Sequence, residues 1–186
     1  MNKPQPQLLD GRLALVTGAG QGNGRAIALG LAAHGADVVA TDIDAAMAAE
    51  TAAAVIATGR RGWPFTLDVT DADACAALAG TVGAEIGPVA ILVNNAGIII
   101  RETIDSARAH DNWRRVLDVN LNGVFNVTHA FLPALRQTRG SIVNIGSIAS
   151  FVGVADTLGY SPSKGGVKLL TQSLARELAR DGIRVN

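Results

Sequence analysis

The chain has 186 residues, of which 48% are hydrophobic, and its 16 Lys and Arg side chains balance its 16 Asp and Glu side chains. This length corresponds to one domain, and the apolar content excludes an intrinsically disordered protein. We expect a cytoplasmic protein without nucleic-acid or membrane partners, because it lacks a cationic excess, an apolar run of ~18 residues and an N-terminal signal core.

Short apolar runs alternate with longer alanine-rich segments of helical period, which is typical of strand–helix–strand units around a parallel sheet. Because the strand-like runs show no polar alternation, we expect all of them to lie in the interior of the sheet. A helix that contains Pro133 needs this residue near an end or a kink. The predicted strands are 12–17, 37–41, 63–67, 90–94 and 141–145, and the predicted helices are 24–34, 45–58, 72–86, 112–136 and 161–180.

Residues 1–10 form a polar N-terminal tail, and a single domain is predicted over 11–186. A sixth strand is predicted at Ile183-Arg184-Val185, directly before the last residue, Asn186. A strand cut short there would leave the preceding helix without a neighbour on one side. We therefore expect the sequence to belong to a longer protein whose C-terminal part is absent.

A glycine-rich turn follows the first predicted strand and opens the first helix. The pyrophosphate of a dinucleotide needs a close backbone approach and N–H donors at a helix N-terminus, and only glycines permit both. An ordinary loop is the alternative, which the position between strand and helix disfavours. The turn predicts cofactor contacts at Gly18, Gln21, Gly22, Asn23 and Gly24.

Asp42 follows the second predicted strand, near the distance from Gly18 that is expected for an acid that binds ribose. A carboxylate there accepts hydrogen bonds from both ribose hydroxyls and repels a 2′-phosphate. No Lys or Arg lies between Gly18 and Gly24 to attract such a phosphate. Asp42 therefore favours NAD over NADP, with a solvated turn residue as the alternative.

Polar residues also follow the fourth and fifth predicted strands, at the edge where open parallel sheets bind ligands. These segments are Asn94-Asn95-Ala96-Gly97 and Gly146-Ser147. Tyr160 and Lys164 are four residues apart, so they share one face of the last helix. Taken singly, Tyr160 or Ser147 would be read as a surface or capping residue. Their conjunction predicts that a hydroxyl, a phenol and an ammonium meet beside the cofactor.

With these motifs in order, the sequence resembles the short-chain dehydrogenase/reductase family of the common NAD(P)-dependent type. The resemblance implies a Rossmann-type, doubly wound parallel sheet of strand order 3-2-1-4-5-6. The matching residues are Thr17-Gly18-x-x-x-Gly22-x-Gly24, Asn94-Asn95-Ala96-Gly97, Asn120 in Val119-Asn120-Leu121, Ser147, and Tyr160-x-x-x-Lys164.

The same resemblance implies a role for each site residue. Tyr160 would be the general acid/base, because a neighbouring cation favours phenolate. Lys164 would supply that cation and bind the nicotinamide ribose, Ser147 would polarise the substrate oxygen, and Asn120 would position a water. Further cofactor contacts are implied at Asp68, Val69, Asn95, Ala96 and Gly97.

The function expected is hydride transfer between NAD and a secondary alcohol or ketone, such as a polyol or sugar alcohol. One alternative is an NADPH-dependent 3-oxoacyl-thioester or carbonyl reductase. Another is an NAD-binding module without turnover, because family members continue into a substrate loop that this sequence lacks. Asn23 replaces the family's usual branched aliphatic residue; we expect the turn to tolerate it, with weaker cofactor binding as the alternative.

The family's usual assembly implies a homotetramer or homodimer that pairs through 112–136 and 161–180. The segments 98–100 and 149–155 are small or apolar, so they disfavour a bulky charged substrate. Cys75 is read as a core thiol. The three histidines are interpreted as surface or helix-end residues and not as metal ligands: His34, His110 and His129. Trp63 and Trp113 are interpreted as core or interface residues.

Overall fold

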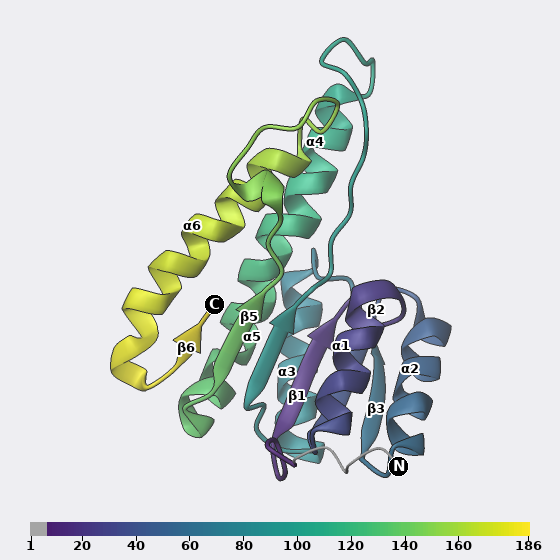
Figure 1. The fold of residues 1–186 in the computed structure, drawn as a ribbon, viewed down its shortest axis with the longest axis vertical. Coiled ribbons are helices and arrows are strands. Elements are labelled where there is room, and N and C mark those ends of the chain that lie inside the picture. Colours follow the sequence, from purple (N-terminus) through teal and green to yellow (C-terminus); the bar gives the residue numbers. More distant parts are fainter. Residues whose placement is uncertain (1–6) are drawn as a thin grey trace, which may run out of the picture.

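The computed structural model describes residues 7–186, so residues 1–6 of the predicted tail lie outside the described part. Six parallel strands form one sheet in the order β3-β2-β1-β4-β5-β6, which confirms the expected fold class and strand order (Figure 1). In the register, Leu15 of β1 lies between Val39 of β2 and Leu92 of β4. The strands are β1 Leu13–Thr17, β2 Asp37–Asp42, β3 Gly62–Thr66, β4 Ile91–Asn94, β5 Ser141–Asn144 and β6 Arg184–Val185.

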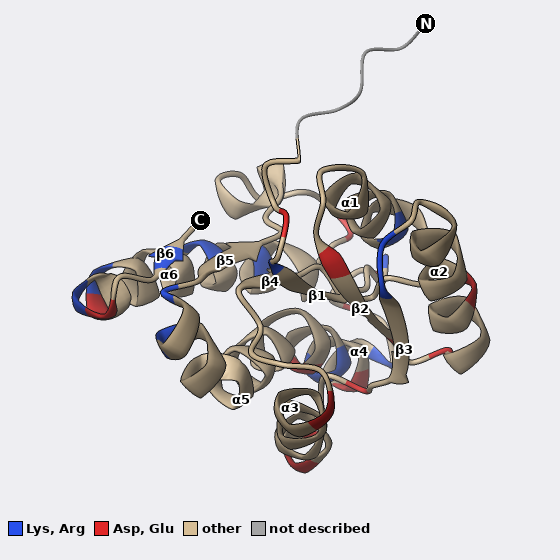
Figure 2. Ribbon diagram, turned by 90° about the horizontal axis from the view of Figure 1, so that it is seen from below, with Lys and Arg blue, Asp and Glu red and all other residues tan. Residues whose placement is uncertain are grey.

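Helices cover both faces of the sheet (Figure 2). Alternate strand residues point to opposite faces, so Leu15 joins the core beneath α3, α5 and α6, whereas Val16 joins the core beneath α1 and α2. No helix within residues 7–186 is both long enough and apolar enough to cross a membrane. The helices are α1 Gly22–Ala33, α2 Ala45–Ala57, α3 Ala72–Glu85, α4 Ala109–Leu117, α5 Gly123–Thr138 and α6 Tyr160–Leu178, with short helical turns η1 Asp118–Asn122, η2 Ile148–Ser150 and η3 Ala179–Asp181.

The predicted interior position of every strand is wrong for β3, which lies at one edge of the sheet. Trp63 and Phe65 of this strand are partly buried against the α3 side, while Pro64 is exposed. An edge strand tolerates proline because one of its sides needs no N–H donors. Cys75 is buried in α3, as expected, and burial raises the pKa of its thiol to about 11.

The long helical stretch predicted over 112–136 is present, but a π-helical turn interrupts its α-helical geometry. α4 ends at Leu117, the π-helical turn η1 follows, and α5 continues to Thr138 with Pro133 inside it. Turns of this kind are common at functional sites. The break lies at Asn120, whose side-chain contacts are described with the site below.

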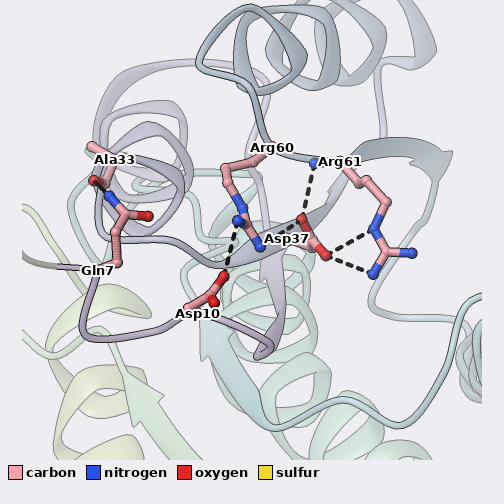
Figure 3. Close-up of polar contacts among 6 residues, drawn as sticks. All are labelled: Gln7, Asp10, Ala33, Asp37, Arg60 and Arg61. Carbon is pink, nitrogen blue, oxygen red and sulfur yellow. Dashed lines mark hydrogen bonds and ion pairs between the residues drawn. The ribbon is translucent and has the colours of Figure 1, made fainter.

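A cluster of charges joins the start of β2 to the turn before β3, at the edge opposite the carboxyl ends of the strands (Figure 3). The buried Asp37 accepts hydrogen bonds from the Arg61 backbone N–H at 2.9 Å and from Arg61 Nε at 2.8 Å. Arg60 bridges Asp37 and Asp10. Burial by itself would raise the pKa of Asp37, but the hydrogen bonds and charges of the two arginines outweigh it and hold that pKa below its ordinary value.

We expect Asp37→Asn to lower the free energy of unfolding at neutral pH by about 2 kcal/mol, because charge-assisted hydrogen bonds are lost in a buried place. The folded pKa lies below the unfolded one, so this contribution is complete above about pH 4 and disappears as the pH falls through the folded pKa. Urea unfolding across this range measures it. Asp181→Asn breaks an exposed pair with Arg136 and is the control, with an expected effect of at most about 1 kcal/mol. Equal effects of the two substitutions at neutral pH would contradict the prediction.

Candidate active site

Two adjoining cavities lie along the carboxyl ends of the strands. The smaller one, of about 380 Å³, is bordered by the glycine turn, Tyr160 and Lys164. The larger one, of about 590 Å³, is bordered by Asp68, Val69 and residues of α4. The two cavities share Gly18, Gln21, Asp42, Ala96, Gly97 and Ile98. They therefore form one cleft that extends from the start of α6 to the loop after β3.

The glycine turn fits a phosphate group on two observations. Gly24 is buried, and a Cβ there would overlap the carbonyl oxygen of Gly18, so no side chain could occupy this position. α1 begins at Gly22, and its N-cap residue Gln21 makes no side-chain hydrogen bond to the first turn. The N–H groups at a helix start attract anions when no side chain caps them. Asn23 is exposed and lines the smaller cavity, so its amide faces the same space.

Asn95 ties the glycine turn to the end of β4. Its Nδ2 donates to the carbonyl oxygens of Thr17 and Gly18, each at 2.9 Å. In return, Thr17 Oγ1 accepts from the backbone N–H groups of Asn95 and Ala96, each at 3.0 Å. Sequence reasoning did not identify Thr17 as a partner, because its position inside a strand carries no polar signal. These bonds set the spacing between β1 and β4, where the two cavities meet.

Asp42 lines both cavities. One carboxylate oxygen accepts from the Gly20 N–H at 2.8 Å and the other from the Asp44 N–H at 3.0 Å. A carboxylate offers about four acceptor positions, so about two stay available for a ligand. The side chain is therefore held by the backbone in a position from which it can accept bonds from hydroxyl groups.

Asp68 and Val69 line the larger cavity, at the other end of the cleft. Asp68 Oδ1 accepts from the backbone N–H and the hydroxyl of Thr70. The carbonyl of Val69 accepts from Asn126 Nδ2 at 3.1 Å, which holds this loop against α5. Arg114 and Arg115 of α4 also border this cavity, and no pattern in the sequence indicated them.

Tyr160 and Lys164 lie together at the start of α6. Tyr160 is the first residue of the helix, so Pro162 falls in the first turn, where a missing N–H costs nothing. Lys164 is only 5% exposed, and its Nζ donates to the Ile145 carbonyl at 2.6 Å. The Nζ atom lies 5.9 Å from the centroid of the Tyr160 ring. Burial lowers the pKa of Lys164.

Ser147 follows β5 as the N-cap residue of η2. Its Oγ accepts from the Ala149 N–H at 3.1 Å, which leaves the hydroxyl proton available for another acceptor. Among the described residues, Gly146 lines the smaller cavity with Tyr160, whereas Ser147 is not one of the lining residues. Ser147 is therefore adjacent in sequence to a residue of the cavity wall but is not itself part of that wall.

Asn120 is completely buried in η1. Its Oδ1 accepts from the Ile98 N–H at 2.7 Å, and its Nδ2 donates to the Ile98 carbonyl at 2.8 Å and to Ser163 Oγ at 3.1 Å. The side chain thus holds the loop after β4 against α6. Ser163 was missed in the sequence, although it lies inside the Tyr160-x-x-x-Lys164 motif.

Comparisons with known proteins find similar chains. The family model described as short chain dehydrogenase matches residues 12–186. A (3R)-3-hydroxyacyl-CoA dehydrogenase of Canis lupus familiaris is 43% identical over 191 residues, which cover 97% of this chain and 73% of that protein. The 3-oxoacyl-[acyl-carrier-protein] reductase FabG of Vibrio harveyi is 38% identical over 181 residues, which cover 96% and 72%.

Among solved structures, one from Beutenbergia cavernae superposes with a TM-score of 0.89 at 38% identity. The match covers 97% of this chain and 72% of that one. That protein is assigned as an NAD(P)-dependent gluconate 5-dehydrogenase, and its crystal structure holds NADP at low occupancy.

Proposed function

The chain belongs to the short-chain dehydrogenase family, whose members are oxidoreductases, and on this premise we propose that it transfers a hydride between NAD and a secondary alcohol or the matching ketone. The observation that carries the proposal is that the buried Lys164 and the ring of Tyr160 border the same cavity as the glycine turn. A general acid/base and a dinucleotide cradle in one cavity support redox chemistry at a hydroxyl group.

The cofactor would be held along the whole cleft. Its pyrophosphate would lie on the N–H groups of Gln21, Gly22, Asn23 and Gly24, its ribose on Asp42, and its adenine between Asp68, Val69 and the segment Asn95-Ala96-Gly97. Tyr160 and Lys164 would hold the nicotinamide ribose. When bound, the nicotinamide supplies the hydride acceptor or donor.

The proton is handled by this chain's own residues. Tyr160 takes the hydroxyl proton of an alcohol, or returns it to a ketone oxygen, in the cavity that it borders together with the buried Lys164. The bond to Ile145 holds the Lys164 ammonium in place. Ser147 donates its free hydroxyl proton to the substrate oxygen, while the Ala149 N–H orients the hydroxyl.

NAD is the proposed cofactor because a carboxylate at Asp42 would repel a 2′-phosphate. We expect Asp42→Asn to weaken NADH binding about tenfold, or about 1.4 kcal/mol, and to weaken NADPH binding less. Calorimetric titration with both cofactors measures the change. Asp73→Asn removes the same charge from an exposed position in α3 and serves as the control. Equal affinities of the unchanged chain for NADH and NADPH would refute the proposed role of Asp42.

The substrate class has two candidates. A polyol or sugar alcohol is the substrate expected from the sequence. Exposed apolar side chains near the start of α6 favour the second candidate, a 3-hydroxyacyl or 3-oxoacyl thioester with an apolar chain. They are Ile99, which lines the smaller cavity, and Ile148 and Phe151, which are 76% and 73% exposed in the segment after Ser147. The names of the two curated relatives agree with the thioester candidate.

The proposed function is tested by following nicotinamide absorbance with a panel of polyols, alkan-2-ols and 3-hydroxyacyl thioesters. Turnover of at least one class with NAD is the expected result. Faster turnover of the thioesters would assign the second candidate. Tight NADH binding without turnover of any class would refute the proposal and favour a cofactor-binding module.

We also propose a homotetramer or homodimer that pairs through α5 and α6. Its support is the exposure of large apolar side chains on these helices, which include Phe125 at 54% and Leu169 at 62%. Large apolar side chains left exposed on a helix are candidates for burial in an interface. Light scattering gives the mass of the assembly, and a monomer would contradict this part of the proposal.

A further inference from the structure

Ser163 is a buried hydroxyl between the two residues that carry the proposed chemistry. It is 0% exposed and lies one helical turn after Tyr160. Its Oγ donates to the Tyr160 carbonyl at 2.7 Å and accepts from Asn120 Nδ2 at 3.1 Å. The hydroxyl is therefore both a donor, to the helix that carries Tyr160, and an acceptor, from the π-helical turn.

Asn120 is itself held firmly. Two short hydrogen bonds, at 2.7 and 2.8 Å, join its amide to the N–H and the carbonyl of Ile98. A continuous series of bonds thus runs from the Ile98 backbone through Asn120 and Ser163 to the backbone of Tyr160. It connects the loop after β4, the turn η1 and the first turn of α6.

The start of α6 is anchored by several bonds. Gly159 is the N-cap residue and makes no side-chain hydrogen bond, but the N–H groups of Ser161 and Ser163 donate to the carbonyls of Thr157 and Gly159. Lys164 is anchored separately, through its Nζ atom, to the Ile145 carbonyl. Among these bonds, the one from Ser163 Oγ to the Tyr160 carbonyl is the one that joins the Tyr160 backbone to Asn120.

We propose that Ser163 is a positioning residue for Tyr160, which holds the phenol at its working distance from Lys164 by joining the first turn of α6 to Asn120. This inference rests on the proposed function and deepens it. Ser163 touches neither cofactor nor substrate, so it acts only through Tyr160. Among the residues that line the smaller cavity with Tyr160, the charged ones are Lys164 and Asp42.

The chain contains a single tyrosine, so a change in near-ultraviolet tyrosine absorption between variants reports on the surroundings of Tyr160 directly and without turnover. This readout separates the positioning role from the proposed function, because it works in a chain that turns over no substrate. Three variants are compared with the unchanged chain. Ser163→Ala removes both bonds, Ser163→Cys keeps weaker ones, and Ser173→Ala makes the same change as the first at an exposed position of α6.

For Ser163→Ala we expect kcat to fall about 10–100-fold with the KM for NAD within about twofold, because small displacements of an acid/base group are costly. The near-ultraviolet absorption of Tyr160 should also change relative to the unchanged chain, since the ring is no longer held at a fixed distance from the Lys164 ammonium. The kcat of Ser163→Cys should lie between those of Ser163→Ala and the unchanged chain. Ser173→Ala should match the unchanged chain in both measurements.

An unchanged tyrosine absorption band in a folded Ser163→Ala variant would overturn the inference, whatever happens to kcat. If the alanine variant does not fold, the cysteine variant decides, because its weaker bonds require a smaller change of the same band. If no form of the chain turns over substrate but the band changes as expected, the proposed function fails while the positioning of Tyr160 by Ser163 stands.

Discussion

Replacing Tyr160 by phenylalanine should lower kcat by about 10²–10⁴-fold, the usual contribution of a positioned general acid/base. The substitution removes one oxygen atom and keeps the ring that starts α6 and lies 5.9 Å from Lys164 Nζ. Affinity for NADH should change much less, because the glycine turn, Asp42 and Lys164 are untouched. Single-turnover and steady-state absorbance measurements with a substrate from the panel give kcat and KM.

Thermal unfolding confirms that the phenylalanine variant is folded. A folded variant that keeps the kcat of the unchanged chain would show that another group moves the proton.

The second large effect is expected at Gly24. A Cβ in Gly24→Ala would overlap the Gly18 carbonyl and lie 2.5 Å from Asn95 Nδ2. Because the first of these groups is backbone, the turn itself must move. We expect NADH affinity to fall about 100-fold or more and the free energy of unfolding to fall by about 1–3 kcal/mol.

Gly30→Ala is the matched control within α1. A Cβ at Gly30 meets nothing within 4 Å, so alanine there should stabilise the helix by about 0.5–1 kcal/mol and leave NADH binding unchanged. Calorimetric titration measures the NADH affinity of both variants. Urea unfolding measures their free energy of unfolding, which should fall in Gly24→Ala and rise in Gly30→Ala. A Gly24→Ala variant that binds NADH as well as Gly30→Ala does would contradict a phosphate site at this turn.

Much of the fold follows from local patterns. The strands β1, β2, β4 and β5 lie within about one residue of the apolar runs that predicted them, and the glycines between β1 and α1 stand where the predicted turn requires them. The strand order implied by the family resemblance places β3 at an edge, whereas its apolar run resembles a central strand and predicted an interior position. Pro64 was the available signal against an interior position.

Within the site, the pairing of Tyr160 with Lys164 could be predicted, since a spacing of four residues places two side chains on one helix face. The division of the fourth predicted helix could not. It coincides with two bonds between Asn120 and Ile98, which are 22 residues apart, and helical periodicity contains no information about such contacts. The same reason explains why Ser163 was missed, since its partner Asn120 is 43 residues away.

By itself, the sequence determined the fold class, the number of strands and the positions of the glycine turn and the Tyr160–Lys164 pair. These properties depend on side-chain period and on residue types that only certain backbone conformations accept. Only the tertiary structure decided where a π-helical turn interrupts the helical stretch before α5, and which groups hold Asp42, Asn120 and Ser163. Those outcomes depend on contacts between residues distant in the chain, and such contacts exist only after the layers have packed.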